Sequence, residues 1–311
     1  FAMARGNDTC VAMEMTKWFN TNYHYIVPEI SKSTTFKLNS KKIIEEYEEA
    51  KELGIKTKIN LLGPITYLGL SKSIDSSDVF FHINNVVKVY KELLEEISKF
   101  DDEIIVQFDE PLFVKDIDTK ILSLIKPVYD VLSNTASNIK IVVASYFEHS
   151  NEATKILVNT PIWALALDFI YGEKNLDTVE LINNSNKTLI AGVIDGRNIW
   201  KSDFKKKIDL LEKISLHINK DKLIVSTTCS LLHVPFSLKY EDNLGKEIKS
   251  WLAFACEKLN ELSLVSKDFF DIQLNLDEIS IIKRNLEDNI QRKTTSKIQN
   301  LEIQNKIKNL K

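Results

Sequence analysis

Cysteine is scarce in this sequence, with three residues in 311, and no two of them form a C-x-x-C pair. Such wide spacing excludes a disulfide framework and a cysteine-rich metal module. Apolar runs are short, so the sequence also lacks the roughly 18 consecutive apolar residues of a membrane-spanning helix. The first residues, FAMARGNDTC, do not have the layout of a signal peptide. Together these absences predict a cytoplasmic protein.

The sequence also has no large excess of positive or negative charge. The 41 basic and 44 acidic residues leave a formal net charge of -3, which gives no sign of a surface for nucleic acid or membrane. Hydrophobic residues make up 44% of the chain, enough for a sizeable core. Because a barrel of alternating strands and helices needs roughly 250 residues, the length allows either one large domain with a tail or two domains.

Six short apolar runs recur along the chain, and each ends in polar residues. Near-continuous apolar runs are typical of parallel strands that are covered on both faces. Segments with helical periodicity separate them, and this alternation predicts βα units around a parallel sheet. The predicted strands lie within residues 56–68, 102–111, 139–148, 161–169, 187–198 and 221–230.

Helix signals fall between these strands. Gly54 is a natural C-terminal stop, and Ser202 or Asp203 suits the N-terminal cap of a later helix. Pro127 lies inside a helical pattern, where it predicts a kink or a break. The predicted helices cover residues 40–54, 86–97, 119–133, 202–214 and 248–262.

The opening aromatic stretch, residues 14–29, counts as one further strand and brings the total to about seven βα units. We therefore predict an α/β fold, a TIM-like (β/α)8 barrel that lacks its first βα unit. Beyond residue 270 the sequence becomes rich in Lys, Asn and Gln, with sparse apolar spacing. We expect a barrel domain at 1–270, incomplete at its N-terminus, and an exposed helical tail at 271–311 that leads away from it.

Polar side chains gather where the predicted strands end, which is the edge of a parallel barrel that carries function. Such a ring could serve a small polar ligand, but carboxylates at strand ends also cap helices and form structural pairs, so both roles stay open. The residues are Asp109, Glu110, Tyr146, Glu148, Asp168, Asp195, Arg197, Cys229 and His233.

A zinc site is a sharper alternative at the same edge. Asp168 and Cys229 could reach one position, but a zinc site needs three or four converging ligands, and nothing near Cys229 supplies a second thiolate. His149 and His233 are isolated histidines in predicted loops. No segment matches a phosphate-binding loop or a G-x-S-x-G turn. From the residues alone, the sequence indicates an α/β barrel with a polar mouth.

Several long motifs, in order along the chain, resemble the N-terminal half of cobalamin-independent methionine synthase. They extend to about residue 262 and are far more specific together than any one alone. The motifs are EMTKWFNTNYHYIVPE, LLGPITYL, VQFDEP, SYFE, VIDGRNIW, TTCSLLHVP and KSWLAFACEKLNEL.

The resemblance implies a methyltransferase of methionine biosynthesis. Enzymes of this family transfer a methyl group from 5-methyltetrahydropteroyltri-L-glutamate, a folate with a polyglutamate tail, to homocysteine. They consist of two face-to-face (β/α)8 barrels. The C-terminal barrel binds zinc through a His-x-Cys pair, a Glu and a Cys, and zinc holds homocysteine as a thiolate. That barrel would be the partner of this chain.

Compared with the catalytic barrel, this chain resembles a degenerate copy. The His-x-Cys pair is matched by Val143 and Ser145, the Glu by Asp168 and the last Cys by Cys229. The family's catalytic histidine is matched by Arg197, which cannot donate a proton near neutral pH. The resemblance therefore implies no metal and no catalytic residue in this chain, which we expect to be inactive alone.

One binding residue is implied. The resemblance implies that the lysine of the family's MTKW motif, here Lys17, contacts the polyglutamate tail of the folate. A flexible ammonium group suits a string of carboxylates, while Trp18, Phe19, Tyr23 and Tyr25 would pack at the barrel mouth and against the partner barrel. The family's N-terminal barrel also begins with a strand, helices and a further basic folate-binding segment that this sequence does not contain.

Two other interpretations remain open. The chain could be a stand-alone, non-catalytic module that binds or stabilises a partner barrel. It could also be an independent enzyme that uses Asp109, Glu110, Asp168 and Cys229 in metal chemistry of its own.

Overall fold

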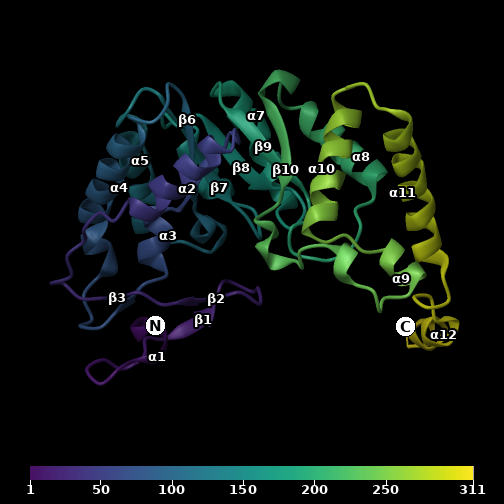
Figure 1. Cartoon of the computed structure of the whole chain (residues 1–311), viewed down its shortest axis with the longest axis horizontal. Coiled ribbons are helices and arrows are strands. Elements are labelled where there is room, and N and C mark those ends of the chain that lie inside the picture. The colour runs from purple at the N-terminus through teal and green to yellow at the C-terminus, as the bar shows by residue number, and fades with distance from the viewer. Residues whose placement is uncertain (311) are drawn as a thin grey trace. The chain divides into compact units, whose positions relative to one another are not determined.

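A computed structural model describes residues 1–310 (Figure 1). The chain consists of two compact units. The first unit comprises Phe1–Gly192 and His217–Ile224, and the second comprises Val193–Leu216 and Val225–Lys311. The boundary expected at residue 270 stays a prediction.

A six-stranded sheet with the order β10-β9-β8-β7-β6-β4 is the centre of the fold. The pairs from β4 to β9 are parallel, with Val106 opposite Ile59, Ile139 opposite Ile104 and Thr188 opposite Ala164. Most strand residues are buried because helices cover both faces of a parallel sheet. All six predicted strands are confirmed: β4 Ile59–Leu62, β6 Ile104–Asp109, β7 Ile139–Ser145, β8 Ala164–Asp168, β9 Thr188–Ile194 and β10 Leu223–Thr227.

The opening aromatic stretch does not join this sheet, so its assignment as a barrel strand is wrong. β1 (Met15–Lys17) and β2 (His24–Ile26) form an antiparallel hairpin of their own. Nearby, β3 (Glu29–Ile30) pairs with β5 (Lys72–Ser73). The stretch shows no simple period because its middle is a turn rather than a strand.

The helices of the first unit follow the predicted pattern. Gly54 adopts a positive φ of 71° just after α2, where a glycine stop was expected. α5 runs through Pro127 without a break, so of the predicted kink or break the break is wrong and the kink stays a prediction. These helices are α1 Ala2–Arg5, α2 Lys41–Glu52, α3 Pro64–Gly69, α4 Ile83–Ile97, α5 Thr119–Ser133, α6 Asn151–Leu157 and α7 Val179–Asn184. Short 3₁₀ turns cover Val79–His82, Pro111–Val114, Glu173–Thr178 and Lys220–Lys222.

The second unit is mostly helical. Asp203 caps α8, as predicted, by accepting the backbone N–H of Lys206. The single helix expected over 248–262 is two helices, because residues 251–254 interrupt it. The elements are α8 Phe204–Ser215, α9 Lys246–Ser250, α10 Ala255–Phe269, α11 Leu276–Thr294 and α12 Leu301–Lys308, with 3₁₀ turns at Leu231–His233 and Leu238–Tyr240.

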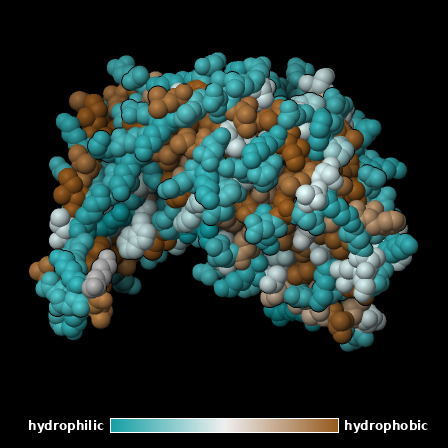
Figure 2. Space-filling view, turned by 180° about the vertical axis from the view of Figure 1, so that it is seen from behind, coloured by the Kyte–Doolittle hydropathy of each residue, from teal (hydrophilic) through white to brown (hydrophobic). Residues whose placement is uncertain are grey.

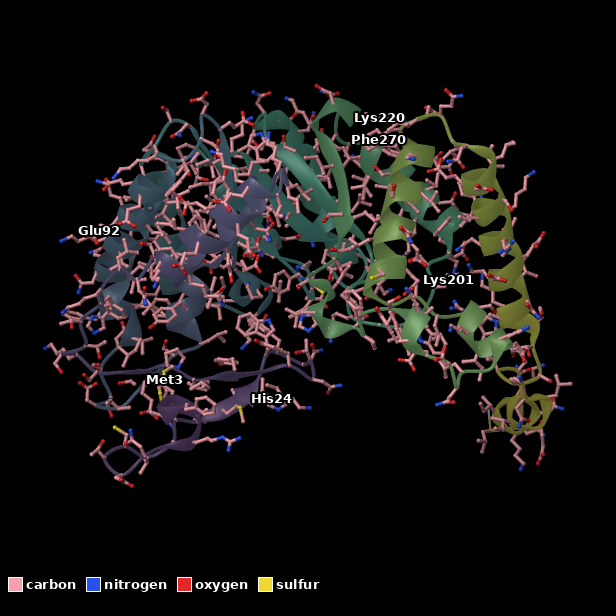
Figure 3. All side chains as sticks on the ribbon, in the orientation of Figure 1. Met3, His24, Glu92, Lys201, Lys220 and Phe270 are labelled. Carbon is pink, nitrogen blue, oxygen red and sulfur yellow. The ribbon has the colours of Figure 1, made fainter. Side chains whose placement is uncertain are left out.

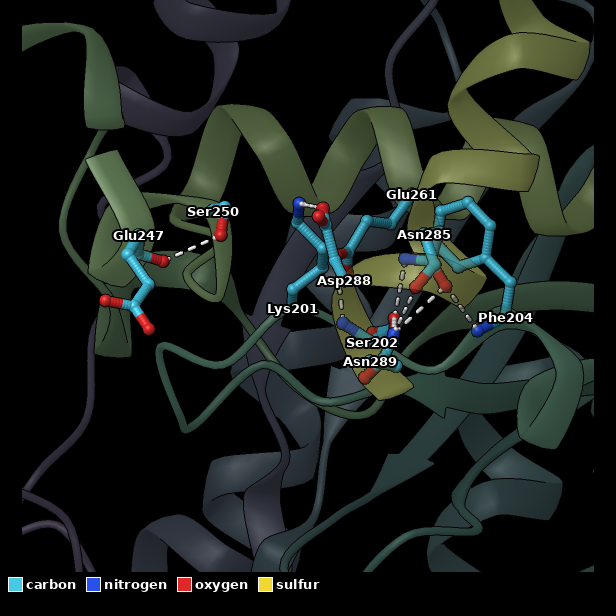
Figure 4. A network of polar contacts seen from close by, with 9 residues as sticks. All are labelled: Lys201, Ser202, Phe204, Glu247, Ser250, Glu261, Asn285, Asp288 and Asn289. Atoms are coloured by element: carbon cyan, nitrogen blue, oxygen red, sulfur yellow. Dashed lines mark hydrogen bonds and ion pairs between the residues drawn. The ribbon is translucent and has the colours of Figure 1, made fainter. Parts of the chain in front are cut away.

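α11 is not exposed throughout, contrary to the expectation for the tail. Two of its asparagines, Asn285 and Asn289, are buried. The Asn285 amide donates to the Ser202 carbonyl at 2.8 Å, and its Oδ1 accepts the backbone N–H of Phe204 at 3.1 Å (Figure 4). α11 is rich in polar residues and yet partly buried, because the backbone of Ser202 and Phe204 forms hydrogen bonds with its asparagine side chains.

Replacing Asn285 with alanine should lower the free energy of unfolding by about 2 kcal/mol, since the backbone N–H of Phe204 loses its partner and the Ser202 carbonyl keeps only the longer bond from Asn289. Urea unfolding followed by circular dichroism measures this loss. Asn305→Ala, on the exposed surface of α12, is the matched control and should change stability by less than about 0.5 kcal/mol. Equal losses in the two variants would contradict a structural role for Asn285.

The surface mixes hydrophilic and hydrophobic residues over the face that Figure 2 displays. Within residues 1–310, no helix is both long enough and apolar enough to cross a membrane.

Candidate functional site

The candidate site begins with the β1–β2 hairpin. Its turn closes through the backbone N–H of Trp18, which donates to the Tyr23 carbonyl at 2.7 Å, and through Thr21, whose hydroxyl donates to the Trp18 carbonyl at 2.7 Å. Phe19 adopts a positive φ of 54°, a conformation that is uncommon outside glycine and costs energy. Tertiary contacts must therefore hold this residue in place.

Aromatic rings supply those contacts. The Trp18 ring meets the Phe19 and Tyr25 rings edge-on, at centroid distances of 5.3 and 5.5 Å. The Phe19 ring lies 5.6 Å from that of Phe147, which follows β7. Phe147 also has a positive φ, of 87°, and packs against Tyr146. The hairpin is thus fixed against the carboxyl-terminal end of the sheet, where parallel α/β folds place their ligands.

Lys17 is the last residue of β1 and lies opposite His24 of β2 in the hairpin. Figure 3 shows the position of His24. Its side chain is exposed. Across residues 1–310 it forms no ion pair or hydrogen bond with another side chain. A second ammonium group, that of Lys115, lies 4.9 Å from the centroid of the Phe19 ring, a cation–π distance. The hairpin therefore carries one uncommitted cation and has another beside it.

Asp109 ends β6 and is the centre of a polar chain. It accepts hydrogen bonds from the Gln107 amide at 2.7 Å and the Tyr146 hydroxyl at 3.2 Å, while Lys58 donates to Gln107. Burial raises the pKa of Asp109, against the lowering effect of these hydrogen bonds and of the Lys58 charge. Burial also lowers the pKa of Lys58. Tyr146 therefore connects Asp109 to the packed rings of Phe147, Phe19 and Trp18.

Glu110, the next residue, has a different place. It is fully buried, and its carboxylate accepts the backbone N–H groups of Ile65 and Thr66 at the start of α3, at 3.2 and 2.7 Å, and the Tyr129 hydroxyl at 2.8 Å. A Cβ at Gly63, between β4 and α3, would lie 2.1 Å from the Cδ of Glu110, so the chain needs glycine at this position. Glu110 is a structural link between β6, α3 and α5.

Asp168 is occupied as well. One carboxylate oxygen accepts the backbone N–H of Phe147 at 3.1 Å, and the other accepts those of Ile170 and Tyr171 at 2.8 and 3.0 Å. These bonds hold the strained Phe147 backbone and the turn after β8. A carboxylate bound by three backbone donors does not fit the role of an open metal ligand.

The loops that follow β6, β7 and β8 enclose a cavity of about 620 Å³ in the first unit. Glu148, one of the residues predicted at the mouth, lines it together with Lys115, His149, Tyr171 and Lys174. The size suits a small ligand.

The remaining predicted residues lie in the second unit. Asp195 is buried and accepts the backbone N–H of Arg197 at 2.8 Å and the Asn198 amide. Cys229 is buried. Burial and the charge of Arg197 lower the pKa of His233. These contacts organise the loops after β9 and β10.

The fit of zinc to this chain can be tested on its residues. Val143 and Ser145, which the resemblance matches to the family's His-x-Cys ligands, are both buried in β7, and Asp168 is bound by backbone donors. Among residues 1–310, no group of three His, Cys, Asp or Glu side chains is arranged to hold a metal ion. The residues present do not fit a zinc centre.

Sequence reasoning missed Lys58, Gln107, Lys115 and the structural role of Tyr129. Gln107 was detectable, since it is a polar residue inside an otherwise apolar strand. Lys115 gave no signal because only the folded chain brings it to Phe19.

A family model described as "Cobalamin-independent synthase, N-terminal domain" matches residues 1–219. The chain belongs to the cobalamin-independent methionine synthase family. It is 49% identical over 312 residues to the 5-methyltetrahydropteroyltriglutamate--homocysteine methyltransferase of Desulforamulus reducens, covering 100% of this chain and 41% of that protein. A relative of the same name from Kali turgidum is 42% identical over 273 residues, covering 86% of this chain and 36% of that protein. The chain thus spans less than half the length of these methyltransferases.

A solved structure supports the fold. The B12-independent methionine synthase from Shewanella sp. W3-18-1, in complex with selenomethionine, aligns with a TM-score of 0.62 at 19% identity, covering 83% of this chain and 75% of that one. At this identity the likeness concerns the fold alone, an α/β fold with a parallel sheet like that of the family's barrel domain.

Proposed function

We propose that this chain is the non-zinc, N-terminal barrel of a cobalamin-independent methionine synthase, and that it binds the polyglutamate tail of 5-methyltetrahydrofolate. The methyl transfer to homocysteine then takes place on a catalytic barrel with its own zinc. The observation that carries the proposal is Lys17, an exposed ammonium group without a partner among the described side chains, held on a hairpin that aromatic packing makes rigid.

The chemistry of the tail suits this arrangement. A polyglutamate tail presents several carboxylates on a flexible chain, and a lysine can follow them because its ammonium group donates in many directions. Lys115 adds a second positive charge next to the hairpin. The rigid Trp18–Phe19–Phe147 contacts limit the entropy lost when the tail binds, since the hairpin is already ordered.

The same proposal covers the rest of the parent protein. We propose that the six strands are six of the eight of a (β/α)8 barrel, that the segment 271–311 leads toward the catalytic barrel, and that the protein is cytoplasmic. In this scheme Asp109, Glu110, Asp168 and Arg197 shape the fold at the strand ends and do not carry the reaction.

Lys17→Ala, introduced into the complete polypeptide that contains this chain, should raise KM for the triglutamate substrate about tenfold, because one charged contact is lost. KM for homocysteine should not change. Steady-state kinetics measure both, and the effect should shrink with the monoglutamate substrate. Lys17→Arg should restore most of the affinity.

Lys88→Ala is the matched control, since Lys88 is an exposed lysine on α4. It should leave both constants unchanged. An unaltered KM for the triglutamate in Lys17→Ala would reject the assignment of Lys17.

A further inference from the structure

The second unit contains a cavity of about 510 Å³, which α10 and α11 border. Both helices pack against α8, and Figure 1 shows them side by side, joined at one end by a loop. The inner wall is apolar and buried, and it is formed by Phe204, Leu238, Leu252, Ala253 and Leu264. A cavity of this volume with apolar walls can enclose the body of a small organic molecule.

Two polar contacts fix which residues of α10 and α11 face each other. Near the connecting loop, Lys267 of α10 pairs with Glu278 of α11 at 2.6 Å. Farther along both helices, Glu261 accepts the backbone N–H of Ser202 at 2.9 Å, while the Asn285 amide donates to the carbonyl of the same residue at 2.8 Å (Figure 4). The helices are therefore antiparallel, with Glu261 and Asn285 at the same level.

Donor side chains lie next to these two residues, at the exposed edge of the cavity. Asn260 precedes Glu261, Arg284 precedes Asn285, and both line the cavity and are exposed. Neither side chain forms a hydrogen bond or an ion pair with another residue within 1–310. An arginine offers N–H donors in a planar fork and an asparagine offers an amide N–H. The cavity thus has an apolar interior and uncommitted donors at its edge.

The other cations of the lining are already engaged. The Lys201 ammonium group pairs with Asp288 at 2.7 Å (Figure 4), and that of Lys249 donates to the Glu241 carbonyl at 3.2 Å. Arg284 is therefore the charged donor that remains for a ligand among the described residues of this lining.

The carboxylates of the lining are held by the chain itself. Besides the paired Asp288 and Glu278, Glu257 accepts the Ser237 hydroxyl at 3.0 Å and the backbone N–H of Phe254 at 3.1 Å. Glu261 is bonded through Oε1 to Ser202, and its Oε2 is buried and does not border the open space. Because these groups add negative charge to the wall, a ligand with one negative charge suits the site better than a doubly charged one.

We propose that this cavity binds a small monocarboxylate with an apolar body. The carboxylate lies against the Arg284 guanidinium, whose fork of N–H groups matches both carboxylate oxygens, and the Asn260 amide adds a further donor. The apolar walls bury the body of the ligand, which removes apolar surface from water. This site is separate from the proposed folate-tail site, since all of its residues lie in the second unit.

Benzoate and benzamide are the probes, because they share an aromatic ring and shape but differ in charge. Titration of the chain at neutral pH by calorimetry or ligand-observed NMR should give a dissociation constant for benzoate of about 1 mM or below, as expected for a ligand of this size. Benzamide should bind at least about tenfold more weakly, because it cannot form the charged pair. The titration contains no folate, so its outcome does not depend on the role proposed for Lys17.

Arg284→Gln should weaken benzoate binding at least about tenfold and remove the preference over benzamide. Arg284→Lys keeps the charge without the fork and should recover part of the affinity. Lys283→Gln is the matched control, since it removes the same charge from the neighbouring exposed position on α11, which does not line the cavity. It should leave benzoate binding unchanged.

Circular dichroism checks that each variant is folded, as expected for substitutions of exposed side chains. Three results would overturn the proposal: no saturable binding of benzoate, equal binding of both probes, or equal effects of Arg284→Gln and Lys283→Gln. If Arg284→Gln does not fold, a crystal structure of the unaltered chain with benzoate decides, and benzoate at any position other than against Arg284 would reject the site.

Discussion

Glu110→Ala should lower the free energy of unfolding by about 4 kcal/mol. The carboxylate is fully buried and accepts hydrogen bonds from the Ile65 and Thr66 backbone and from the Tyr129 hydroxyl. Alanine would leave these three donors buried without a partner, and each such donor costs about 1–3 kcal/mol. The alanine variant no longer has to bury a charged carboxylate, and this gain offsets part of the loss. The expected change is therefore smaller than the summed cost of three unpaired donors.

Urea unfolding monitored by fluorescence measures the change. Glu48→Ala is the matched control, because Glu48 is an exposed residue on α2, where alanine favours the helix and should alter stability by less than about 0.5 kcal/mol. A loss below about 1 kcal/mol in Glu110→Ala would show that Glu110 does not link β6 to α3 and α5.

The stability that depends on Glu110 should also change with pH. Burial raises the pKa of this carboxyl from 4.5 to about 7, against the lowering effect of its hydrogen bonds. A carboxyl whose pKa is higher in the folded state contributes stability that is complete below pH 4.5 and is lost as the pH rises through 7. At about 1.4 kcal/mol for each pKa unit, the contribution amounts to about 3 kcal/mol.

The measurement compares the unaltered chain with Glu110→Gln from pH 5 to pH 8. Glutamine cannot titrate, so the difference in unfolding free energy between the two proteins isolates this one group. The unaltered chain should lose stability relative to the variant by about 3 kcal/mol as the pH rises over this range. A constant difference would mean that the carboxyl is already ionised at pH 5.

Much of the sheet was predictable from the sequence. Strands such as 104–109 and 139–145 are nearly continuous apolar runs, a pattern typical of strands covered on both faces. The stop at Gly54 and the cap at Asp203 were predictable too, because their backbone conformations depend on local chemistry. The family was readable from its long motifs, which the comparison with known proteins confirmed.

The candidate site was predictable only in part. The sequence placed Asp109 and Glu110 together at a strand end, but it could not tell that one joins the aromatic cluster while the other is buried against α3 and α5. Neighbouring residues of a strand face opposite sides of the sheet, and what lies on each side comes from distant segments. The sequence alone therefore assigned both the same role.

Residue identity and local periodicity were enough to predict the six strands of the sheet and the family. The hairpin within residues 14–29, the backbone donors bound to Asp168 and the burial of Asn285 within α11 became evident only in the folded chain. The reason is physical: a polar or aromatic side chain is stable wherever its hydrogen bonds and ring contacts are satisfied, and in this chain the partners of these residues are far away in the sequence.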